Sequence, residues 1–302
     1  MLRAKRVAIN AMASRAVALR AASTSTQNPD EISKFSKLAR LWWDEDSAAF
    51  GALHRMNQVR VPIVVEAAIA AEAARGDVPT ARSGRTIRPL ARTSVLDVGS
   101  GGGILAEALA RVGAIVTGLD ASAENVAAAS AHSVIDPDIA ERVFYEKLLV
   151  EDLAAQLAGA VEGSVAEEPL SGAAARAPAG GFDVVVSSEV IEHVNSPAMF
   201  VAALAACLRP GGVLVMTTIT RTALSYAGAI FAAEQLAGLV PPGTHDFAKF
   251  LRPDELSGLM VDAGLVPALP EPIAYNPITG RWSRGGGRVV MQYALSGTKP
   301  LQ

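Results

Sequence analysis

The sequence is poor in the features that mark a disulfide-stabilised, membrane-spanning or nucleic-acid-binding protein. Cys207 is the only cysteine among 302 residues, so no intramolecular disulfide and no cysteine-based zinc site can form. The sequence has no run of 18 uncharged apolar residues, which argues against a transmembrane helix. The formal net charge is −3, and because nucleic-acid binding needs a strongly basic surface, we expect no nucleic-acid partner. Half of the residues are hydrophobic, which is too apolar for a disordered chain.

The N-terminal segment has no acidic residue before Asp30. Five basic residues precede it: Arg3, Lys5, Arg6, Arg15 and Arg20. Serines and threonines cluster at residues 23–26, and Arg15 interrupts the apolar run that a secretory signal requires. This composition is typical of a mitochondrial or plastid transit peptide, which we place at residues 1–26. The alternative is a disordered basic tail.

Two further regions follow the leader. Residues 27–93 are expected to form an N-terminal helical cap with helices over 30–40 and 61–74. Residues 76–93 carry prolines, glycines and arginines without apolar periodicity, which predicts an exposed loop. The core domain is expected to occupy residues 94–302.

Short apolar runs alternate with helical patterns along this last region. Strands are predicted over residues 94–98, 115–119, 142–146, 183–188, 213–218, 265–269 and 289–295. Helices are predicted over residues 104–112, 124–132, 197–208 and 253–262. Such alternation indicates a parallel sheet with helices on both faces, so the predicted fold class is α/β, a doubly wound, mostly parallel seven-stranded sheet. Residues 159–181 are rich in alanine, glycine, proline and serine, which predicts a low-complexity surface insertion without a catalytic part.

A glycine-rich loop follows the first predicted strand. Its glycines are Gly99, Gly101 and Gly103, and a helical pattern begins directly after them. We expect this loop to present bare backbone amides to a ligand at the N-terminus of the helix. The dinucleotide fingerprint needs a glycine at the position of Ile104, so the loop does not match a dinucleotide-binding dehydrogenase.

Two carboxylates accompany the glycine loop. Asp120 ends the next predicted strand, where a carboxylate can accept hydrogen bonds from both ribose hydroxyls of an adenosine. Asp97 precedes the glycines, and an acid at that place suits a cationic, amino-acid-bearing nucleoside better than a pyrophosphate. S-adenosylmethionine is such a ligand, and the alternative is a dinucleotide-binding fold with an altered loop.

A second group of polar residues follows the fourth predicted strand. Glu189, Glu192 and His193 lie at i, i+3 and i+4, so one helical turn would gather them on one side. Two carboxylates and an imidazole can hold a divalent cation, and His193 alone can act as a base near neutral pH. The remaining alternative is that Glu192 and His193 only cap the next helix and order the loop.

These motifs resemble the class I S-adenosylmethionine-dependent methyltransferases, which have a Rossmann-like fold. Further segments match one family in order, the ubiquinone-biosynthesis O-methyltransferases, over about residues 31–295. They are Phe35 with Trp42-Trp43-Asp44, Leu53-His54-Arg55-Met56-Asn57, Gly99 to Glu107, Gly118-Leu119-Asp120, Glu192-His193-Val194, Val240 to Asp246, Lys249-Phe250 and Tyr275-Asn276-Pro277-Ile278-Thr279. The chain departs from the bacterial members in longer segments at 76–93 and 159–181.

The resemblance implies roles for individual residues. The resemblance and the loop pattern together suggest the cofactor-binding residues, which are Arg60, Asp97, Gly99, Gly101, Asp120 and Ser188. Arg60 is expected to meet the methionine carboxylate of S-adenosylmethionine, and Ser188 to line the cofactor site. The catalytic residues are expected to be His193, Glu192 and Glu189, and the same three match the residues that hold Mg²⁺ in eukaryotic members.

The implied reaction is methylation of a catechol hydroxyl on polyprenylated dihydroxybenzoate and demethylubiquinol. We expect metal-assisted deprotonation of that hydroxyl, with His193 as the direct base as the alternative. The competing functions are methylation of another phenolic or lipid acceptor and a non-catalytic, cofactor-binding subunit of a membrane assembly.

A polyprenyl tail implies contact with a membrane. Residues 225–240 are apolar nearly all round as a helix and too short to span a bilayer, so they predict an interfacial element, with a buried lid helix as the alternative. The resemblance implies a peripheral protein on the matrix side of the mitochondrial inner membrane, joined to a ubiquinone-biosynthesis complex.

Overall fold

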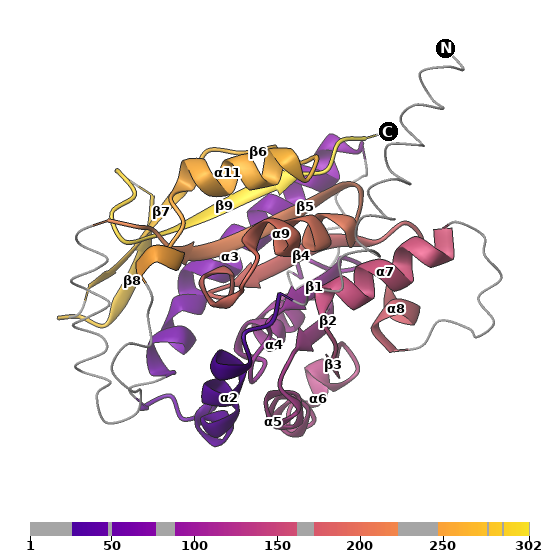
Figure 1. The fold of residues 1–302 in the computed structure, drawn as a ribbon. Helices are drawn as coiled ribbons and strands as arrows, with labels where there is room; N and C mark the ends of the chain where they lie inside the picture. The colour runs from indigo at the N-terminus through magenta and orange to yellow at the C-terminus, as the bar shows by residue number, and fades with distance from the viewer. Residues whose placement is uncertain are drawn as a thin grey trace, which may run out of the picture.

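The computed structural model describes residues 26–47, 50–76, 88–161, 172–222, 247–276, 278–285 and 287–301. A single mixed sheet runs through the molecule with helices on both faces (Figure 1). The order of its strands is β3-β2-β1-β4-β5-β9-β7-β8, and β6 pairs with β9. Residues 1–25 of the predicted transit peptide and the predicted apolar helix at residues 225–240 lie outside the described residues.

The described residues form nine strands. They are β1 Ser94–Val98, β2 Ile115–Asp120, β3 Val143–Lys147, β4 Phe182–Ser188, β5 Leu208–Ile219, β6 Val266–Pro267, β7 Glu271–Asn276, β8 Arg281–Arg284 and β9 Gln292–Thr298. The first five pair in parallel, and β9 runs antiparallel to β5. The predicted α/β class and its parallel core are confirmed.

The predicted count of seven strands is too low. The hairpin of β7 and β8 extends the sheet beyond β9; the residues of β8 alternate between exposed and half-buried, and β7 buries Ile273 alone. A strand such as Arg-Trp-Ser-Arg lacks the apolar run that signals a buried strand, so the sequence pattern does not reveal it. The segment predicted as a strand over 265–269 pairs only at Val266–Pro267.

The described helices include three short 3₁₀ turns, labelled η. They are α2 Pro29–Lys37, η1 Ala39–Leu41, α3 Gly51–Ala74, α4 Ile104–Arg111, α5 Ala123–Ser133, α6 Pro137–Ala140, α7 Val150–Val161, α8 Gly172–Arg176, η2 Ile191–His193, α9 Pro197–Ala206, η3 Phe247–Lys249 and α11 Pro253–Asp262. Within the described residues, no helix combines the length and the apolarity needed to cross a membrane.

Both faces of the parallel strands are buried, which explains their continuous apolar sequences. On one face, Val95, Val184 and Val215 pack with side chains of α3 and α4. On the other face, Leu96 and Leu214 pack with α7, α9 and α11. The sheet is thereby fixed between two helical layers, and the carboxyl ends of its parallel strands form one edge of the molecule's central cavity.

Two helices differ from their predictions. α3 begins at Gly51, ten residues before the predicted start at 61, and Leu53, Met56, Val59 and Ile63 recur at helical spacing across that boundary. The predicted insertion at 159–181 is helical at both ends: α7 continues to Val161, and α8 buries Ala173 and Ala174. Alanine-rich composition resembled a linker, but alanine is also the best helix former.

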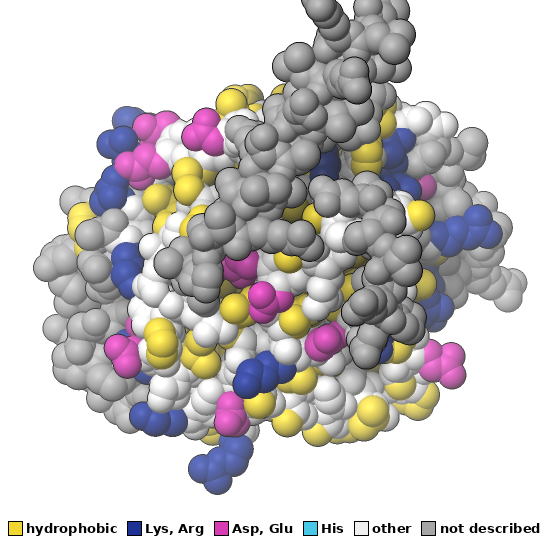
Figure 2. Space-filling view, turned by 45° about the vertical axis from the view of Figure 1, so that its right-hand side comes forward, with side chains coloured by type: hydrophobic (Ala, Val, Ile, Leu, Met, Phe, Trp, Pro, Cys, Tyr) yellow, Lys and Arg dark blue, Asp and Glu magenta, His cyan; other side chains and the backbone are white. Residues whose placement is uncertain are grey.

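The surface of the described residues mixes charges of both signs. Figure 2 shows Lys and Arg side chains interspersed with Asp and Glu side chains around small apolar areas on one face. Such a surface fits the small negative net charge of the chain.

Candidate active site

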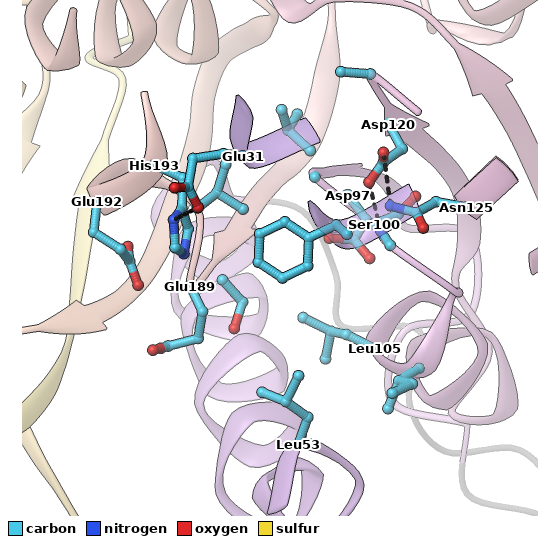
Figure 3. Close-up of a pocket in the computed structure, with 18 of the residues that line it drawn as sticks. Glu31, Leu53, Asp97, Ser100, Leu105, Asp120, Asn125, Glu189, Glu192 and His193 are labelled. Carbon is cyan, nitrogen blue, oxygen red and sulfur yellow. Dashed lines mark hydrogen bonds and ion pairs between the residues drawn. The ribbon is translucent and has the colours of Figure 1, made fainter. Parts of the chain in front are cut away.

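A cavity of about 1310 Å³ opens at the carboxyl ends of the parallel strands. All nine residues predicted from the sequence line it: Arg60, Asp97, Gly99, Gly101, Asp120, Ser188, Glu189, Glu192 and His193. Figure 3 shows two groups of polar side chains, one around Asp97, Ser100, Asp120 and Asn125 and one around Glu31, Glu189, Glu192 and His193. We call the first the cofactor half and the second the acceptor half.

The glycine loop of the cofactor half is shaped by its backbone. Gly99, Gly101 and Gly103 have φ of 77°, 54° and 88°, values that residues with a side chain rarely adopt. The amides of Gly99 and Ser100 donate to the carbonyl of Leu119 at 2.8 and 2.9 Å. The expected row of bare amides is therefore not present, because the loop uses these two donors to attach itself to β2.

The tryptophan pair of the Trp-Trp-Asp motif packs on this loop. A Cβ at Gly101 or Gly102 would come within 2.5 or 2.3 Å of the Trp42 ring. The indole nitrogen of Trp42 donates to Asn125 Oδ1 at 2.9 Å, and that of Trp43 donates to the carbonyl of Gly102 at 2.9 Å. The glycines at these two positions are thus required for close packing of the N-terminal cap as well as for loop conformation.

Asp120 connects the loop to α5. Its Oδ2 accepts from the amide of Gly101 at 2.9 Å, and its Oδ1 accepts from Ser122 N at 2.8 Å and Asn125 Nδ2 at 3.2 Å. Burial raises the pKa of Asp120, and these hydrogen bonds oppose the shift. A carboxylate oxygen has further acceptor capacity, so the predicted contact with a ribose is compatible with this arrangement.

Two polar atoms of the cofactor half are buried without a hydrogen-bond partner. They are Asp97 Oδ2 and Ser100 Oγ. Buried polar atoms are normally bonded, so these two mark a place where a polar ligand would fit. Burial raises the pKa of Asp97 to about 7, with Arg60 opposing and Asp120 reinforcing the shift. A cationic ligand beside Asp97 would stabilise its ionised form, which fits the ammonium group of S-adenosylmethionine.

Arg60 lies between the two halves. Its guanidinium donates to Ser188 Oγ at 3.0 Å, to the Leu53 carbonyl at 2.8 Å and to Asn57 Oδ1 at 2.7 and 3.1 Å. Burial lowers the pKa of Arg60 to about 10, and the charges of Glu189 and Asp97 oppose that shift. A buried cation of this kind is suited to a ligand carboxylate, which is the contact that the resemblance implies for Arg60.

Glu189 has an unusual backbone conformation at the end of β4. Its φ is 57°, in the left-handed region that non-glycine residues seldom occupy. Thr217 Oγ1 donates to its Oε1 and Gln292 Nε2 to its Oε2, both at 2.9 Å. Burial and the nearby charge of Glu192 raise the pKa of Glu189 to about 7. The strained backbone thus aims a carboxyl group into the cavity, where conformational strain is typical of functional positions.

Glu192 and His193 follow on the short turn η2 and face different partners. Glu192 Oε2 accepts from Thr218 Oγ1 at 2.9 Å. His193 Nδ1 lies 3.0 Å from Oε2 of Glu31, which comes from helix α2 (Figure 3). Burial lowers the pKa of His193, but the contact with Glu31 and the charges of Glu192, Glu31 and Glu189 outweigh burial and raise it.

The predicted helical turn over 189–193 is therefore not formed. Because η2 covers only Ile191–His193, Glu189 precedes it and the three residues do not share one helical turn. Among the described residues, no three His, Cys, Asp or Glu side chains are placed to hold a metal ion together. The predicted magnesium site of three ligands is not assembled. The carboxylates of Glu189 and Glu192 still form a pair of oxygen donors close enough for one to raise the pKa of the other.

Several residues of the site could not be identified from the sequence. Glu31 and Phe35 of α2 contact His193, Asn125 of α5 bonds Asp120, and Thr217 and Gln292 hold Glu189. No local pattern marks them, because each reaches the site through the fold rather than through a neighbour in sequence. For Phe35, the match to the family motif is the one signal available.

The fold and the cavity define the class of S-adenosylmethionine-dependent methyltransferases. Residues 64–268 match the family described as a methyltransferase domain. The fold is similar to a solved S-adenosylmethionine-dependent methyltransferase of Thermotoga maritima, a possible histamine N-methyltransferase, with a TM-score of 0.51 and 15% identity over 89% of this chain and 99% of that one.

Closer relatives share one name. The mitochondrial ubiquinone biosynthesis O-methyltransferase of Mus musculus is 38% identical over 86% of this chain and 62% of its own length. The ubiquinone biosynthesis O-methyltransferases of Ralstonia nicotianae and Caulobacter vibrioides are 39% and 36% identical, over 85% and 92% of this chain and 89% and 97% of theirs. The chain belongs to the family of ubiquinone biosynthesis O-methyltransferases, although it spans only about 62% of the length of the mouse relative.

Proposed function

We propose that this protein transfers the methyl group of S-adenosylmethionine to a catechol hydroxyl of a polyprenylated precursor in ubiquinone biosynthesis. One observation carries the proposal: a single cavity joins the cofactor half to the acceptor half. The name shared by the relatives supports the choice of acceptor. A methyltransferase acting on another phenol would share the cavity but would not prefer this acceptor.

The cofactor half binds and orients the methyl donor. Asp97 faces its ammonium group, Arg60 its carboxylate and Asp120 its ribose. The sulfonium supplies the methyl group in an in-line displacement, for which sulfur, methyl and oxygen must be collinear. Fixing this geometry can lower the barrier by about 7–11 kcal/mol in the best cases, and the hydrogen-bonded positions of the buried Arg60 and the half-buried Asp120 provide such rigidity.

The acceptor half removes the proton. A catechol hydroxyl is a weak nucleophile until it is ionised, and the neutral imidazole of His193 is the proposed proton acceptor. The negative charges of Glu31, Glu192 and Glu189 stabilise the imidazolium that results, which is the same effect that raises the pKa of His193.

Magnesium is proposed in a narrower form than the sequence suggested. Mg²⁺ is commonly held by one or two carboxylates together with water and substrate oxygens, and the Glu189–Glu192 pair fits that donor set whereas the imidazole does not. The ion would supply positive charge that favours the ionised hydroxyl.

The test is an assay with a short-tailed demethylubiquinol, comparing the native sequence with Glu192→Gln before and after rigorous chelation by EDTA. We expect methyl transfer by the native protein, loss on chelation and recovery with Mg²⁺, with Glu192→Gln insensitive to both treatments. Full activity of the native protein after chelation would contradict the role of magnesium. Absence of methyl transfer to any catechol, with intact binding of S-adenosylhomocysteine, would contradict the proposed reaction.

The same proposal places the protein on the matrix side of the inner mitochondrial membrane, as a peripheral member of a ubiquinone-biosynthesis complex. The acid-free leader and the mitochondrial designation of the mouse relative support this location. The apolar segment at 225–240 is the proposed contact with lipid, and flotation of the purified protein with cardiolipin-containing liposomes tests that contact.

A further inference from the structure

We propose that Glu31 is a positioning residue that orients the imidazole of His193, so that helix α2 completes the reaction site from outside the methyltransferase domain. The inference rests on the proposed role of His193. It concerns a residue that precedes the segment matching the methyltransferase family by more than thirty positions.

Glu31 is placed unlike any other residue of its helix. It is the only buried residue of α2, with 9% of its surface exposed. An acid is rarely buried on an amphipathic helix unless a partner compensates its charge. Two basic side chains flank the carboxylate of Glu31: Lys34 Nζ donates to Oε1 at 2.8 Å, and His193 Nδ1 lies 3.0 Å from Oε2, an oxygen that accepts no aligned hydrogen bond from the described residues.

The imidazole of His193 is held on a second side as well. Phe35, one turn further along α2, meets the ring edge-on, with 5.3 Å between ring centroids and 81° between the planes. An apolar ring and a carboxylate on one helix thus determine both the tilt and the rotation of the imidazole. In Figure 3 its second ring nitrogen points away from Glu31, toward the side where Glu189 lies.

Helix α2 is attached at both ends, which makes it a stable platform. Before the helix, the carbonyl of Thr26 accepts from the amide of Asn195 at 2.9 Å, two residues after His193. Near its end, Ser36 Oγ lies 2.8 Å from Ser122 Oγ, and the amide of Ser122 is bonded to Asp120. The helix therefore bridges the acceptor half and the cofactor half of the cavity.

The chemical role follows from the two nitrogens of the ring. An imidazole that donates a proton from Nδ1 to a carboxylate is fixed in the tautomer whose Nε2 accepts. The substrate proton then passes to Nε2, Nδ1 keeps its own proton, and Glu31 remains ionised throughout. Without Glu31, both tautomers and several ring orientations become accessible, and only part of the population is competent.

The experiment compares three variants of the full chain: Glu31→Gln, Glu31→Asp and Asp30→Asn. Asp30 is the adjacent acid on the exposed side of α2, so it controls for loss of one negative charge. We expect Glu31→Gln to lower kcat on the order of 10–100-fold, which is part of the roughly 10²–10⁴-fold that a positioned general base contributes. The KM for S-adenosylmethionine and the Kd for S-adenosylhomocysteine should stay within about twofold, Glu31→Asp should recover most of kcat, and Asp30→Asn should match the native protein.

A spectroscopic readout separates positioning from a structural role. In ¹⁵N spectra of the protein without substrate, His193 should show Nδ1 protonated in the native chain and a shifted tautomer balance in Glu31→Gln. An unchanged kcat in Glu31→Gln would overturn the inference. So would a loss of kcat accompanied by an equal loss of cofactor affinity and no recovery in Glu31→Asp, because α2 would then act only as scaffold.

His193→Ala, measured in the same assay, distinguishes this inference from the proposed function. If His193→Ala retains full methyl transfer, His193 is not the base, and the proposed role of Glu31 is refuted as well. If His193→Ala is inactive while Glu31→Gln is fully active, only the inference about Glu31 fails.

Discussion

The two halves of the cavity are built in different ways. In the cofactor half, Asp120 bonds partners 2, 5 and 19 positions away in sequence, all within β1, its loop, β2 and α5. In the acceptor half, Glu189 bonds partners 28 and 103 positions away, and His193 meets Glu31 from the N-terminal cap. The hydrogen bonds of Asp120 are thus local in sequence, although Trp42 and Trp43 of the N-terminal cap also contact this half. The side chains of Glu189 and His193 are held by contacts between distant segments of the chain.

This difference predicts a division of function between the two halves. Changes in the cofactor half should mainly alter affinity for the nucleoside, and changes in the acceptor half should mainly alter turnover. Each prediction below tests that division, beginning with the largest effect.

Replacing His193 should give the largest loss. We expect His193→Ala to lower kcat by about 10²–10⁴-fold, the range typical of a lost general base. Since the imidazole lies outside the cofactor half, calorimetric titration should find the affinity for S-adenosylhomocysteine unchanged. A fall in that affinity comparable to the fall in kcat would break the division between the halves.

Replacing Asp120 should reduce affinity rather than turnover. Hydrogen bonds to a charged group contribute about 1.5–3 kcal/mol each, so Asp120→Ala should weaken S-adenosylhomocysteine binding by about 10–100-fold or more. With saturating S-adenosylmethionine, kcat should stay within a few-fold of the native value. The exposed acid Asp138 on the neighbouring helix α6 provides the control Asp138→Asn, for which we expect native affinity.

The pH dependence of cofactor binding should give the smallest effect. The pKa of Asp97 is about 7 without a ligand, and a cofactor ammonium beside it would lower that pKa. Binding then releases a proton, and affinity rises as pH increases through 7. We expect a gain of about three- to tenfold between pH 6 and pH 8.

Calorimetry in buffers of different ionisation enthalpy measures the proton released, and Asp97→Asn should abolish both the release and the pH dependence. An unchanged pH dependence in Asp97→Asn would assign the effect to another group.

Without cofactor, the free energy of unfolding depends on pH in the opposite direction from cofactor affinity. Because the folded-state pKa lies above the ordinary value of 3.8, Asp97 binds protons more strongly in the folded state and stability falls as pH rises from about 4 to 7.

The same division explains what could be predicted from the sequence. The strand Ser94–Val98, the glycine loop, helix α4 and Asp120 follow from signals that span fewer than thirty residues, and all were placed within a residue or two. Glu31, Thr217 and Gln292 carry no local signal, because their roles arise from strand order and from helix α2 lying against η2. The hairpin of β7 and β8 was missed for the related reason that its pattern of exposure is set by packing on β9 and α3.

The left-handed backbone of Glu189 has a consequence for how this protein can change. A non-glycine residue in that region costs of order 1–3 kcal/mol, and the amide of Glu189, bonded to the Thr217 carbonyl at 3.0 Å, helps to offset the cost. Mutations that relax this corner would make the fold more thermostable while turning the carboxylate away from the acceptor. Selection for heat resistance and selection for turnover therefore act in opposite directions at this one residue.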